Sequence, residues 1–256
     1  MSAINEIVYS FFSYAKRPHL YPELGRKIIK NIFQRNSATK GKEIALNWCK
    51  NNSISQQEAV KLFHNENPNI FKLYPEAVKY AIDQEKKCPV KMGGAGALNL
   101  IYAICENLKA KNVLETGVAY GWSTLAILLS LQNREAHLYS SDMPYATKNN
   151  EDFVGIVIPS ELRKQWSLYR FADRESLPKI FKKQDQFDFI HYDSDKAYNG
   201  RMWAYNILWS KISKNGILMS DDIADNSAFM DFCNLLKIKP VIVNFDDKYA
   251  GILIKS

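Results

Sequence analysis

The chain has 256 residues, of which 46% are hydrophobic and 24% are charged. A chain of this length corresponds to one large domain, or to one domain with an appendage, and the composition excludes a disordered chain, a collagen and a coiled coil. The formal net charge is +7, and residues 1–92 carry all of the excess, with 15 Lys and Arg against 8 Asp and Glu. Residues 93–256 carry 19 of each sign.

Neither a membrane span nor a secretory signal is predicted. The longest uncharged stretch, residues 116–133, contains two glycines, a Gln and an Asn, which argues against a transmembrane helix. The apolar run 7–15 follows Glu6 and has no cationic segment before it, unlike a signal peptide. The four cysteines are scattered and contain no CxxC pair, so neither disulfides nor zinc are indicated. We therefore expect a reduced, cytoplasmic protein.

Residues 1–92 are predicted to form a basic, helical N-terminal cap. Between positions 16 and 42, eight Lys and Arg alternate with apolar residues and face only Glu23, a pattern typical of basic amphipathic helices. Ser55 and Glu58 form a capping box that predicts the start of a further helix. The basic face is open to three interpretations: a solvated surface, contact with an anionic substrate or membrane surface, or nucleic-acid binding. Nucleic acid is not expected, because no motif supports it.

From residue 93 onward, short apolar strands alternate with helices, which is typical of a parallel sheet covered on both faces. The predicted strands are 112–115, 137–141, 166–169, 187–192 and 216–220, and the predicted helices are 122–131, 176–183 and 197–212. Two final strands, 240–245 and 249–255, are separated by too short a loop for a parallel crossover. They are therefore expected to form an antiparallel hairpin.

A glycine loop joins the first of these strands to its helix. In the run VLETGVAYGWS, residues 113–123, the strand ends in an acid and the two glycines would allow a tight turn close to a ligand. Ala119 interrupts the GxGxxG pattern of dinucleotide-binding folds, which argues against a nicotinamide dehydrogenase. Asp142 ends the next strand, where a carboxylate can accept hydrogen bonds from both hydroxyls of a ribose or can cap a turn.

The order of strand, glycine loop, helix and strand-Asp, with the terminal hairpin, resembles class I S-adenosylmethionine (SAM)-dependent methyltransferases. Within them, LETGVAYGWST is similar to the loop of the metal-dependent O-methyltransferases of the catechol and caffeoyl-CoA type. The resemblance implies an α/β fold with a helical N-terminal extension. Its Rossmann-like, doubly wound, mostly parallel seven-stranded sheet would have the order 3-2-1-4-5-7-6 and an antiparallel last strand. The residues that the resemblance assigns to SAM, within a domain spanning 93–256, are Gly93, Glu115, Gly117, Gly121, Ser123, Asp142, Asp173 and Arg174.

A cluster of acids is predicted at the ends of two adjacent strands. Asp193 and Asp195 follow one strand, and Asp221 and Asp222 follow the next. Neighbouring carboxylates repel each other unless a cation lies between them, and all-oxygen ligands suit Mg²⁺, Ca²⁺ or Mn²⁺. Alternatively, Asp221 and Asp222 cap the turn that follows them. The resemblance assigns Asp193, Asp221 and Asp222 to a divalent cation, most naturally magnesium.

Two residues are candidates for the base that takes the acceptor's proton. The catechol-type resemblance places the catalytic lysine at Lys196, whereas the double Asp is similar to macrocin-type sugar O-methyltransferases, in which Asp195 would be the base. His191 is expected to be a packed strand residue. Residues 144–159 are long enough to form a loop over the substrate; the alternative is that they are only surface.

We therefore expect a divalent-metal-dependent O-methyltransferase that acts on a hydroxyl of a small molecule or glycan. We also expect a homo-oligomer, because appended helices often pair subunits in such enzymes. The alternative from another class is a noncatalytic module of the same fold that binds SAM or a partner.

Overall fold

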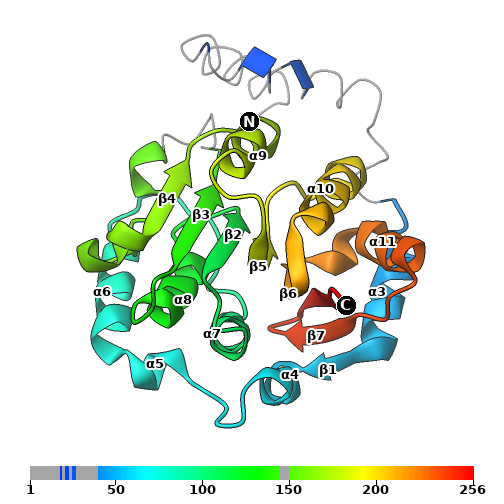
Figure 1. Cartoon of the computed structure of the whole chain (residues 1–256), viewed down its shortest axis with the longest axis horizontal. Helices are drawn as coiled ribbons and strands as arrows, with labels where there is room; N and C mark the ends of the chain where they lie inside the picture. Colours follow the sequence, from blue (N-terminus) through cyan, green and yellow to red (C-terminus); the bar gives the residue numbers. More distant parts are fainter. Residues whose placement is uncertain (1–17, 19–20, 23–24, 27–39, 144–149) are drawn as a thin grey trace.

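The computed structural model describes residues 18, 21–22, 25–26, 40–143 and 150–256. Most of the basic segment for which an anionic contact was expected therefore lies outside the described residues, as do residues 144–149 of the expected substrate loop. The centre of the described chain is an eight-stranded mixed sheet of order β1-β7-β8-β6-β5-β2-β3-β4 (Figure 1).

The strands are β1 (Ser53–Ser55), β2 (Asn112–Thr116), β3 (His137–Ser141), β4 (Trp166–Tyr169), β5 (Phe187–Tyr192), β6 (Ile212–Ser220), β7 (Val241–Phe245) and β8 (Lys248–Ile254). The α-helices are α3 (Lys42–Asn52), α4 (Gln56–Phe63), α5 (Ile70–Leu73), α6 (Pro75–Glu85), α7 (Leu98–Asn107), α8 (Trp122–Leu131), α9 (Asp173–Phe181), α10 (Tyr198–Ser210) and α11 (Ala228–Leu236). The short 3-10 helices within residues 40–143 and 150–256 are η2 (Glu151–Phe153), η3 (Ser160–Gln165) and η4 (Ile223–Asp225).

The predicted α/β fold class is confirmed. Strands β2 to β6 pair in parallel, and β8 runs antiparallel to both β6 and β7. Strands β2 to β8 follow the predicted order 3-2-1-4-5-7-6 when β2 is counted as the first strand. The hairpin turns at Asp246 and Asp247, both of which have positive φ angles of 46° and 60°. Two successive residues of this kind give the turn whose twist matches that of antiparallel strands.

The eighth strand, β1, was not predicted. It pairs in parallel with β7, from Ser53 opposite Ile242 to Ser55 opposite Asn244, and so forms an edge of the sheet. The predicted capping box begins at Ser55, the last residue of β1. The Ser55 hydroxyl accepts a hydrogen bond from the Glu58 amide, and the Glu58 carboxylate accepts one from the Ser55 amide. Three residues are too few to show a periodic pattern, which is why β1 could not be found in the sequence.

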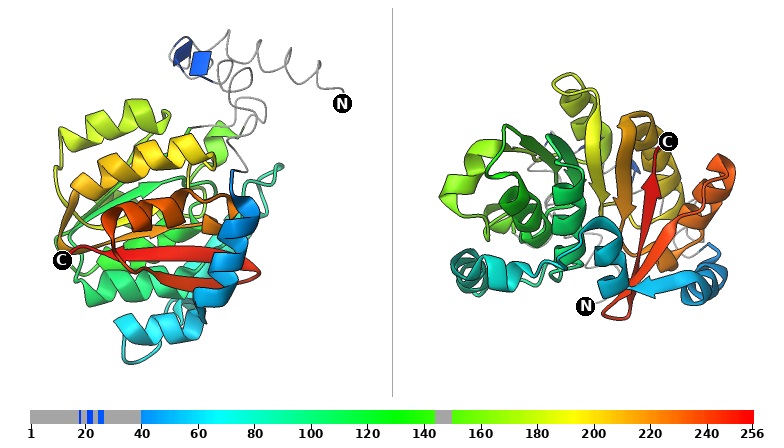
Figure 2. Two further views of the ribbon diagram at one scale, coloured as in Figure 1. Left: turned by 90° about the vertical axis from the view of Figure 1, so that its right-hand side faces the viewer. Right: turned by 60° about the horizontal axis from the view of Figure 1, so that its bottom comes forward.

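Helices cover both faces of the sheet, and each face has its own hydrophobic core (Figure 2). Helices α4 to α8 pack on one face, where Leu125 and Ile127 of α8 are fully buried. Helices α3, α9, α10 and α11 pack on the other, around Tyr205 and Phe229. Burial on both faces explains why the parallel strands read as continuous apolar runs.

The parallel strands end together at one edge of the sheet. Thr116 of β2 lies opposite both Ser141 of β3 and Tyr192 of β5, and Tyr192 lies opposite Ser220 of β6. The residues that follow these four strand ends are therefore neighbours in space, although more than a hundred positions separate the first from the last.

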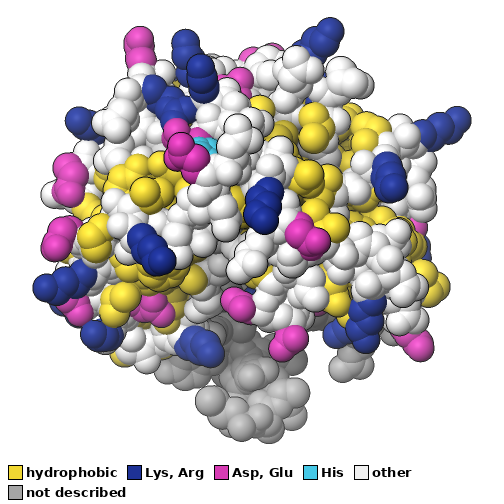
Figure 3. Space-filling model, turned by 90° about the horizontal axis from the view of Figure 1, so that it is seen from below, with side chains coloured by type: hydrophobic (Ala, Val, Ile, Leu, Met, Phe, Trp, Pro, Cys, Tyr) yellow, Lys and Arg dark blue, Asp and Glu magenta, His cyan; other side chains and the backbone are white. Residues whose placement is uncertain are grey.

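When the molecule is seen from below, hydrophobic side chains reach its surface among charged ones (Figure 3). The exposed large apolar residues of helices α4 to α6 are Leu62, Phe71, Tyr80, Leu73 and Ile82. Charged side chains divide the apolar area of this face. In the part of the chain that the structure describes, none of the helices has the length and hydropathy to cross a membrane.

Candidate active site

The loop after β2 turns as the two glycines predict. Gly117 and Gly121 have φ angles of +84° and +101°, and Ala119 between them also has a positive φ of 49°. A Cβ atom on Gly117 would collide with the backbone carbonyl of Asp193, which follows β5. Only a residue without a side chain lets the loop pass this close to the neighbouring strand end.

Glu115 lies beneath this loop and not on its ligand side. The carboxylate is fully buried, and one oxygen accepts from the Ser123 hydroxyl at 2.6 Å. The other oxygen accepts from Thr124 at 2.6 Å and from Ser140 at 2.9 Å. Glu115 thereby ties the end of β2 to β3 and to the first turn of α8.

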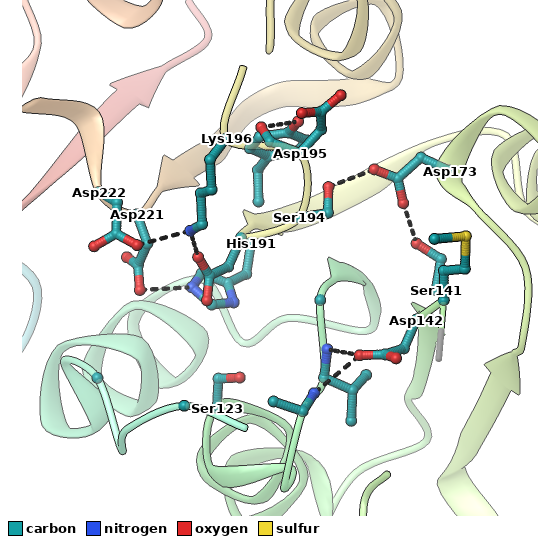
Figure 4. A pocket seen from close by; sticks show the side chains of 18 of the residues that line it. Ser123, Ser141, Asp142, Asp173, His191, Ser194, Asp195, Lys196, Asp221 and Asp222 are labelled. Carbon is teal, nitrogen blue, oxygen red and sulfur yellow. Dashed lines mark hydrogen bonds and ion pairs between the residues drawn. The ribbon is translucent and has the colours of Figure 1, made fainter. Parts of the chain in front are cut away.

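Asp142, directly after β3, holds the loop from the side. Its Oδ2 accepts from the backbone amides of Val118 and Ala119 at 2.8 and 2.9 Å (Figure 4). Burial raises the pKa of this carboxyl, and the two amide bonds oppose that rise. The carboxylate therefore braces the loop while remaining on the wall of the cavity in front of it.

Asp173 and Arg174 begin α9 at the same edge. The Asp173 carboxylate accepts from the hydroxyls of Ser141, at 2.7 Å, and of Ser194. Burial raises its pKa to about 6, and the two hydroxyl bonds act in the opposite direction. Arg174 lies with its guanidinium carbon 4.0 Å from the ring centroid of Trp203.

The predicted acidic cluster forms, and Lys196 lies within it. Its ammonium group contacts Oδ1 of Asp193 and lies 2.8 Å from Oδ2 of Asp222 (Figure 4). Burial alone would lower the pKa of Lys196, but the two carboxylates outweigh burial and raise it. A second ammonium group, that of Lys248, lies 3.6 Å from Oδ1 of Asp222.

Asp221 faces a different partner. Its Oδ2 lies 3.6 Å from Nε2 of the fully buried His191, whose Nδ1 lies 3.7 Å from Oε1 of Glu115. Burial would lower the pKa of His191, but Asp221 and Glu115 raise it to about 10. His191 stacks on Phe189 as a packed strand residue, as predicted, and it also lines the cavity, which was not predicted.

A buried arginine supports the Asp221–Asp222 turn and was missed in the sequence. Arg201 of α10 is fully buried, and its guanidinium donates to the carbonyls of Asp222, at 2.8 Å, and Asp221, at 3.3 Å. Asp222 has a left-handed backbone, with φ 53° and ψ 37°. The only available signal was a charged residue on a helix whose neighbours Ala204 and Tyr205 are apolar.

One cavity of about 780 Å³ joins the glycine loop to the acidic cluster. Eleven of the thirteen predicted site residues line it: Gly93, Gly117, Ser123, Asp142, Asp173, Arg174, Asp193, Asp195, Lys196, Asp221 and Asp222. The two that are not among its described lining residues are Glu115 and Gly121. Asp195 accepts from the Ala197 amide at 2.9 Å and points away from Lys196 (Figure 4). Arg26, Trp203 and Lys248 also line the cavity and were not predicted to do so.

The described half of the expected substrate loop packs against the glycine loop. The Gly155 amide donates to the Ala119 carbonyl at 2.9 Å, and the Val157 amide donates to that of Tyr120 at 3.2 Å. Val157 and Ile158 are fully buried. Residues 150–159 therefore hold the glycine loop in place by packing against it.

The three predicted ligands of a divalent cation do not converge on a common point. An ammonium group lies between Asp193 and Asp222, and Asp221 is turned towards His191. Within residues 40–143 and 150–256 and the few described before them, no three His, Cys, Asp or Glu side chains are grouped so that they could hold a metal ion. The present arrangement of the carboxylates thus does not fit a metal ion.

Residues 114–223, which span the glycine loop and the acidic cluster, match a family described as a methyltransferase domain. No curated protein matches the sequence.

Several solved structures share the fold of this chain. An O-methyltransferase from Bacillus cereus in complex with SAH is 11% identical, with a TM-score of 0.55 over 77% of this chain and 100% of its own. An SAH-bound methyltransferase from Podospora anserina is 14% identical, with a TM-score of 0.54 over 88% and 97%. The O-methyltransferase TomG from Streptomyces achromogenes, in complex with SAM, is 13% identical, with a TM-score of 0.51 over 79% and 100%. At such identities the similarity establishes the fold.

Proposed function

We propose that the protein is a SAM-dependent O-methyltransferase that acts on a hydroxyl of a small molecule or glycan. The observation that carries this proposal is the single cavity shared by the glycine loop, Asp142 and the charged cluster of Asp193, Lys196 and Asp222. In such an α/β sheet, ligands bind at the edge where parallel strands end. The fold is also that of solved structures described as bound to SAM or SAH.

We assign the half of the cavity around the glycine loop to SAM. The free oxygen of Asp142 would accept from the ribose, since its other oxygen is held by two loop amides. Asp173 and Arg174 would border the adenine, while Gly93, Gly117 and Ser123 would approach the methionine portion. Glu115 and Gly121 would act indirectly, because they shape the loop from beneath.

Bound SAM would supply an electrophilic methyl group on a sulfonium. The residues at the ends of β5 and β6 would hold the acceptor oxygen in line with that methyl, so that an O–C bond forms as the S–C bond breaks. The acceptor hydroxyl must lose its proton to a base within hydrogen-bonding reach. The walls of the cavity would exclude water, which would otherwise compete as an acceptor.

The surroundings of the two candidate bases favour Asp195 for this proton. Lys196 is held between two carboxylates that raise its pKa, so it retains its own proton at neutral pH. Asp195 lines the same cavity, and its Oδ1 accepts from the Ala197 amide at 2.9 Å. We therefore assign the base to Asp195 and an electrostatic role to Lys196.

The division of the chain into an N-terminal cap, residues 1–92, and a SAM-binding domain, residues 93–256, is part of the proposal. Arg26 supports it, because this residue lines the cavity and forms a bidentate ion pair with Glu175 of α9 at 2.6 and 2.8 Å. The cap would then contribute a positive group to the cavity. An anionic acceptor or membrane surface, a homo-oligomer and a cytoplasmic location remain expectations drawn from the sequence.

The function is tested in two steps. Isothermal titration should first show binding of SAM that is weakened by Asp142→Ala. The matched carboxylate control is Asp231→Ala in α11, because Asp231 is not among the described residues that line the cavity. Transfer of a labelled methyl group to a panel of sugars, catechols and acyl thioesters should follow, and it should be lost in Asp195→Asn. SAM binding without transfer to any hydroxyl acceptor would instead favour a noncatalytic binding module.

A further inference from the structure

The acidic cluster contains a cation that belongs to the chain itself. The ammonium group of Lys196 contacts Oδ1 of Asp193 and lies 2.8 Å from Oδ2 of Asp222. These two acids follow β5 and β6, which are neighbours in the sheet. Lys196 extends towards both of them in Figure 4. Because a positive charge lies between the two carboxylates, their mutual repulsion is offset by attraction to the ammonium group.

Two further contacts complete this arrangement. Lys248 lies 3.6 Å from the second oxygen of Asp222, so the strand after the hairpin turn adds another positive charge. Asp221 is directed to His191, with 3.6 Å between Oδ2 and Nε2. Oδ1 of Asp221 has no hydrogen-bond partner among the described residues. Asp221 is thus the one acid of the three predicted ligands that does not contact Lys196.

We propose that the ammonium group of Lys196 takes the place at which the sequence led us to expect a divalent cation. Asp193, Lys196 and Asp222 then form a built-in ion cluster on the acceptor side of the cavity. The inference rests on the proposed function, because it assigns a role to the acceptor half of that same site.

An ammonium group in place of a divalent cation narrows the class of acceptor that the site can hold. An ammonium group has three N–H donors, and two of them are directed at Asp193 and Asp222. The third is left for one oxygen of the acceptor. A divalent ion has several coordination positions and can hold both oxygens of a vicinal diol. The cluster therefore suits acceptors that present a single hydroxyl, and vicinal diols should have no advantage as substrates.

Metal binding tests the cluster without any turnover. Titration of the full-length protein with Mn²⁺, followed by electron paramagnetic resonance, should show no site-specific binding in the wild type. Lys196→Ala leaves two carboxylates without their partner, so this variant should gain a Mn²⁺ site that is at least ~10-fold tighter than the nonspecific binding of Mn²⁺ to the wild type. Lys179→Ala on α9, whose ammonium group lies over the Phe171 ring, is the matched lysine control and should behave as the wild type does.

Two results would overturn the inference. One is a Mn²⁺ site in the wild type that is lost in the double variant Asp193→Asn/Asp222→Asn. The other is a folded Lys196→Ala variant with no gain in Mn²⁺ affinity. Circular dichroism establishes folding, and if Lys196→Ala is unfolded, Lys196→Gln makes the same comparison with a side chain of similar length.

Failure of this inference is distinguishable from failure of the proposed function. A wild-type protein that neither binds SAM nor transfers a methyl group would contradict the function. The comparison of Mn²⁺ binding between the wild type and Lys196→Ala would not be affected. Conversely, methyl transfer that is abolished by a chelator and restored by Mg²⁺ would overturn the ion cluster while supporting the enzyme. The expected result is a rate that a chelator leaves unchanged.

Discussion

The fully buried guanidinium of Arg201 donates a 2.8 Å hydrogen bond to the backbone carbonyl of Asp222, a residue held in the left-handed region. The same guanidinium also reaches the carbonyl of Asp221. A single side chain of α10 thus fixes the turn from which both acids project into the cavity.

Replacement of Arg201 by Met should therefore destabilise the protein. Two buried carbonyls would lose their donor, and each loss costs about 1 to 3 kcal/mol, so we expect the free energy of unfolding in urea to fall by ~2 to 4 kcal/mol. Asn206→Ala, on the exposed side of the same helix, should change it by less than ~0.5 kcal/mol. Equal stability of the two variants would show that Arg201 does not hold the turn.

Gly117 should not tolerate a side chain, whereas Gly94 should. The left-handed backbone alone costs a non-glycine residue about 1 to 2 kcal/mol, and a Cβ on Gly117 would also collide with the Asp193 carbonyl. We expect Gly117→Ala to lower the free energy of unfolding by at least ~2 kcal/mol. Gly94→Ala is the matched control, because a Cβ there meets nothing within 4 Å. A Gly117→Ala protein as stable as Gly94→Ala would contradict the close approach of the loop to β5.

Asp173 should make stability depend on pH in an unusual direction. Its pKa is raised by burial to about 6 in the folded protein, above the value of ~4 for an unfolded Asp. Between these values the folded state binds the proton more tightly, so this residue's contribution to stability falls as the pH rises from ~4 to ~6.

The measurement is the difference in urea stability between wild type and Asp173→Asn at several pH values. Relative to the variant, the wild type should lose about 1 to 2 kcal/mol between pH 4 and pH 6, after allowance for the partial exposure of the carboxyl. A difference that stays constant or grows in favour of the wild type would mean that Ser141 and Ser194 outweigh burial.

The pair of Arg26 and Glu175 should couple the start of the chain to α9. Their side chains are 33% and 25% exposed, so a double-mutant cycle with Arg26→Ala and Glu175→Ala should give a coupling free energy of about 0.5 to 1 kcal/mol. High salt should weaken the coupling, since the pair is partly solvated. Strict additivity of the two single variants would show that the ion pair contributes nothing in solution.

Much of the fold was predictable because its strands are short apolar runs between clear helical patterns. The predicted helix 122–131 and the strands 137–141, 166–169 and 187–192 match α8, β3, β4 and β5 residue for residue. The strand predicted at 216–220 begins four residues earlier, at Ile212, because Lys214 and Asn215 break the apolar run although they continue the strand. Strand β1 left no pattern at all.

The site was predictable in its members and less so in its contacts. Strand ends that carry acids identified Asp142, Asp193 and Asp222, because parallel strands bring their ends to one edge. Which charge neutralises which acid depends on side-chain directions that spacing does not encode. The sequence therefore suggested a metal ion among the acids, where the structure has Lys196 and, beside it, Lys248 from the distant hairpin.

Strand β1 has a consequence for any attempt to study residues 93–256 alone. It covers the outer side of β7 with a parallel pairing from Ser53 to Ser55, and its removal would leave the N–H and C=O groups of β7 open to another chain. Open edges of this kind promote intermolecular pairing. A protein truncated to residues 93–256 should therefore self-associate although its catalytic residues are intact. By covering the edge of β7, the short strand β1 reduces the tendency of the protein to aggregate.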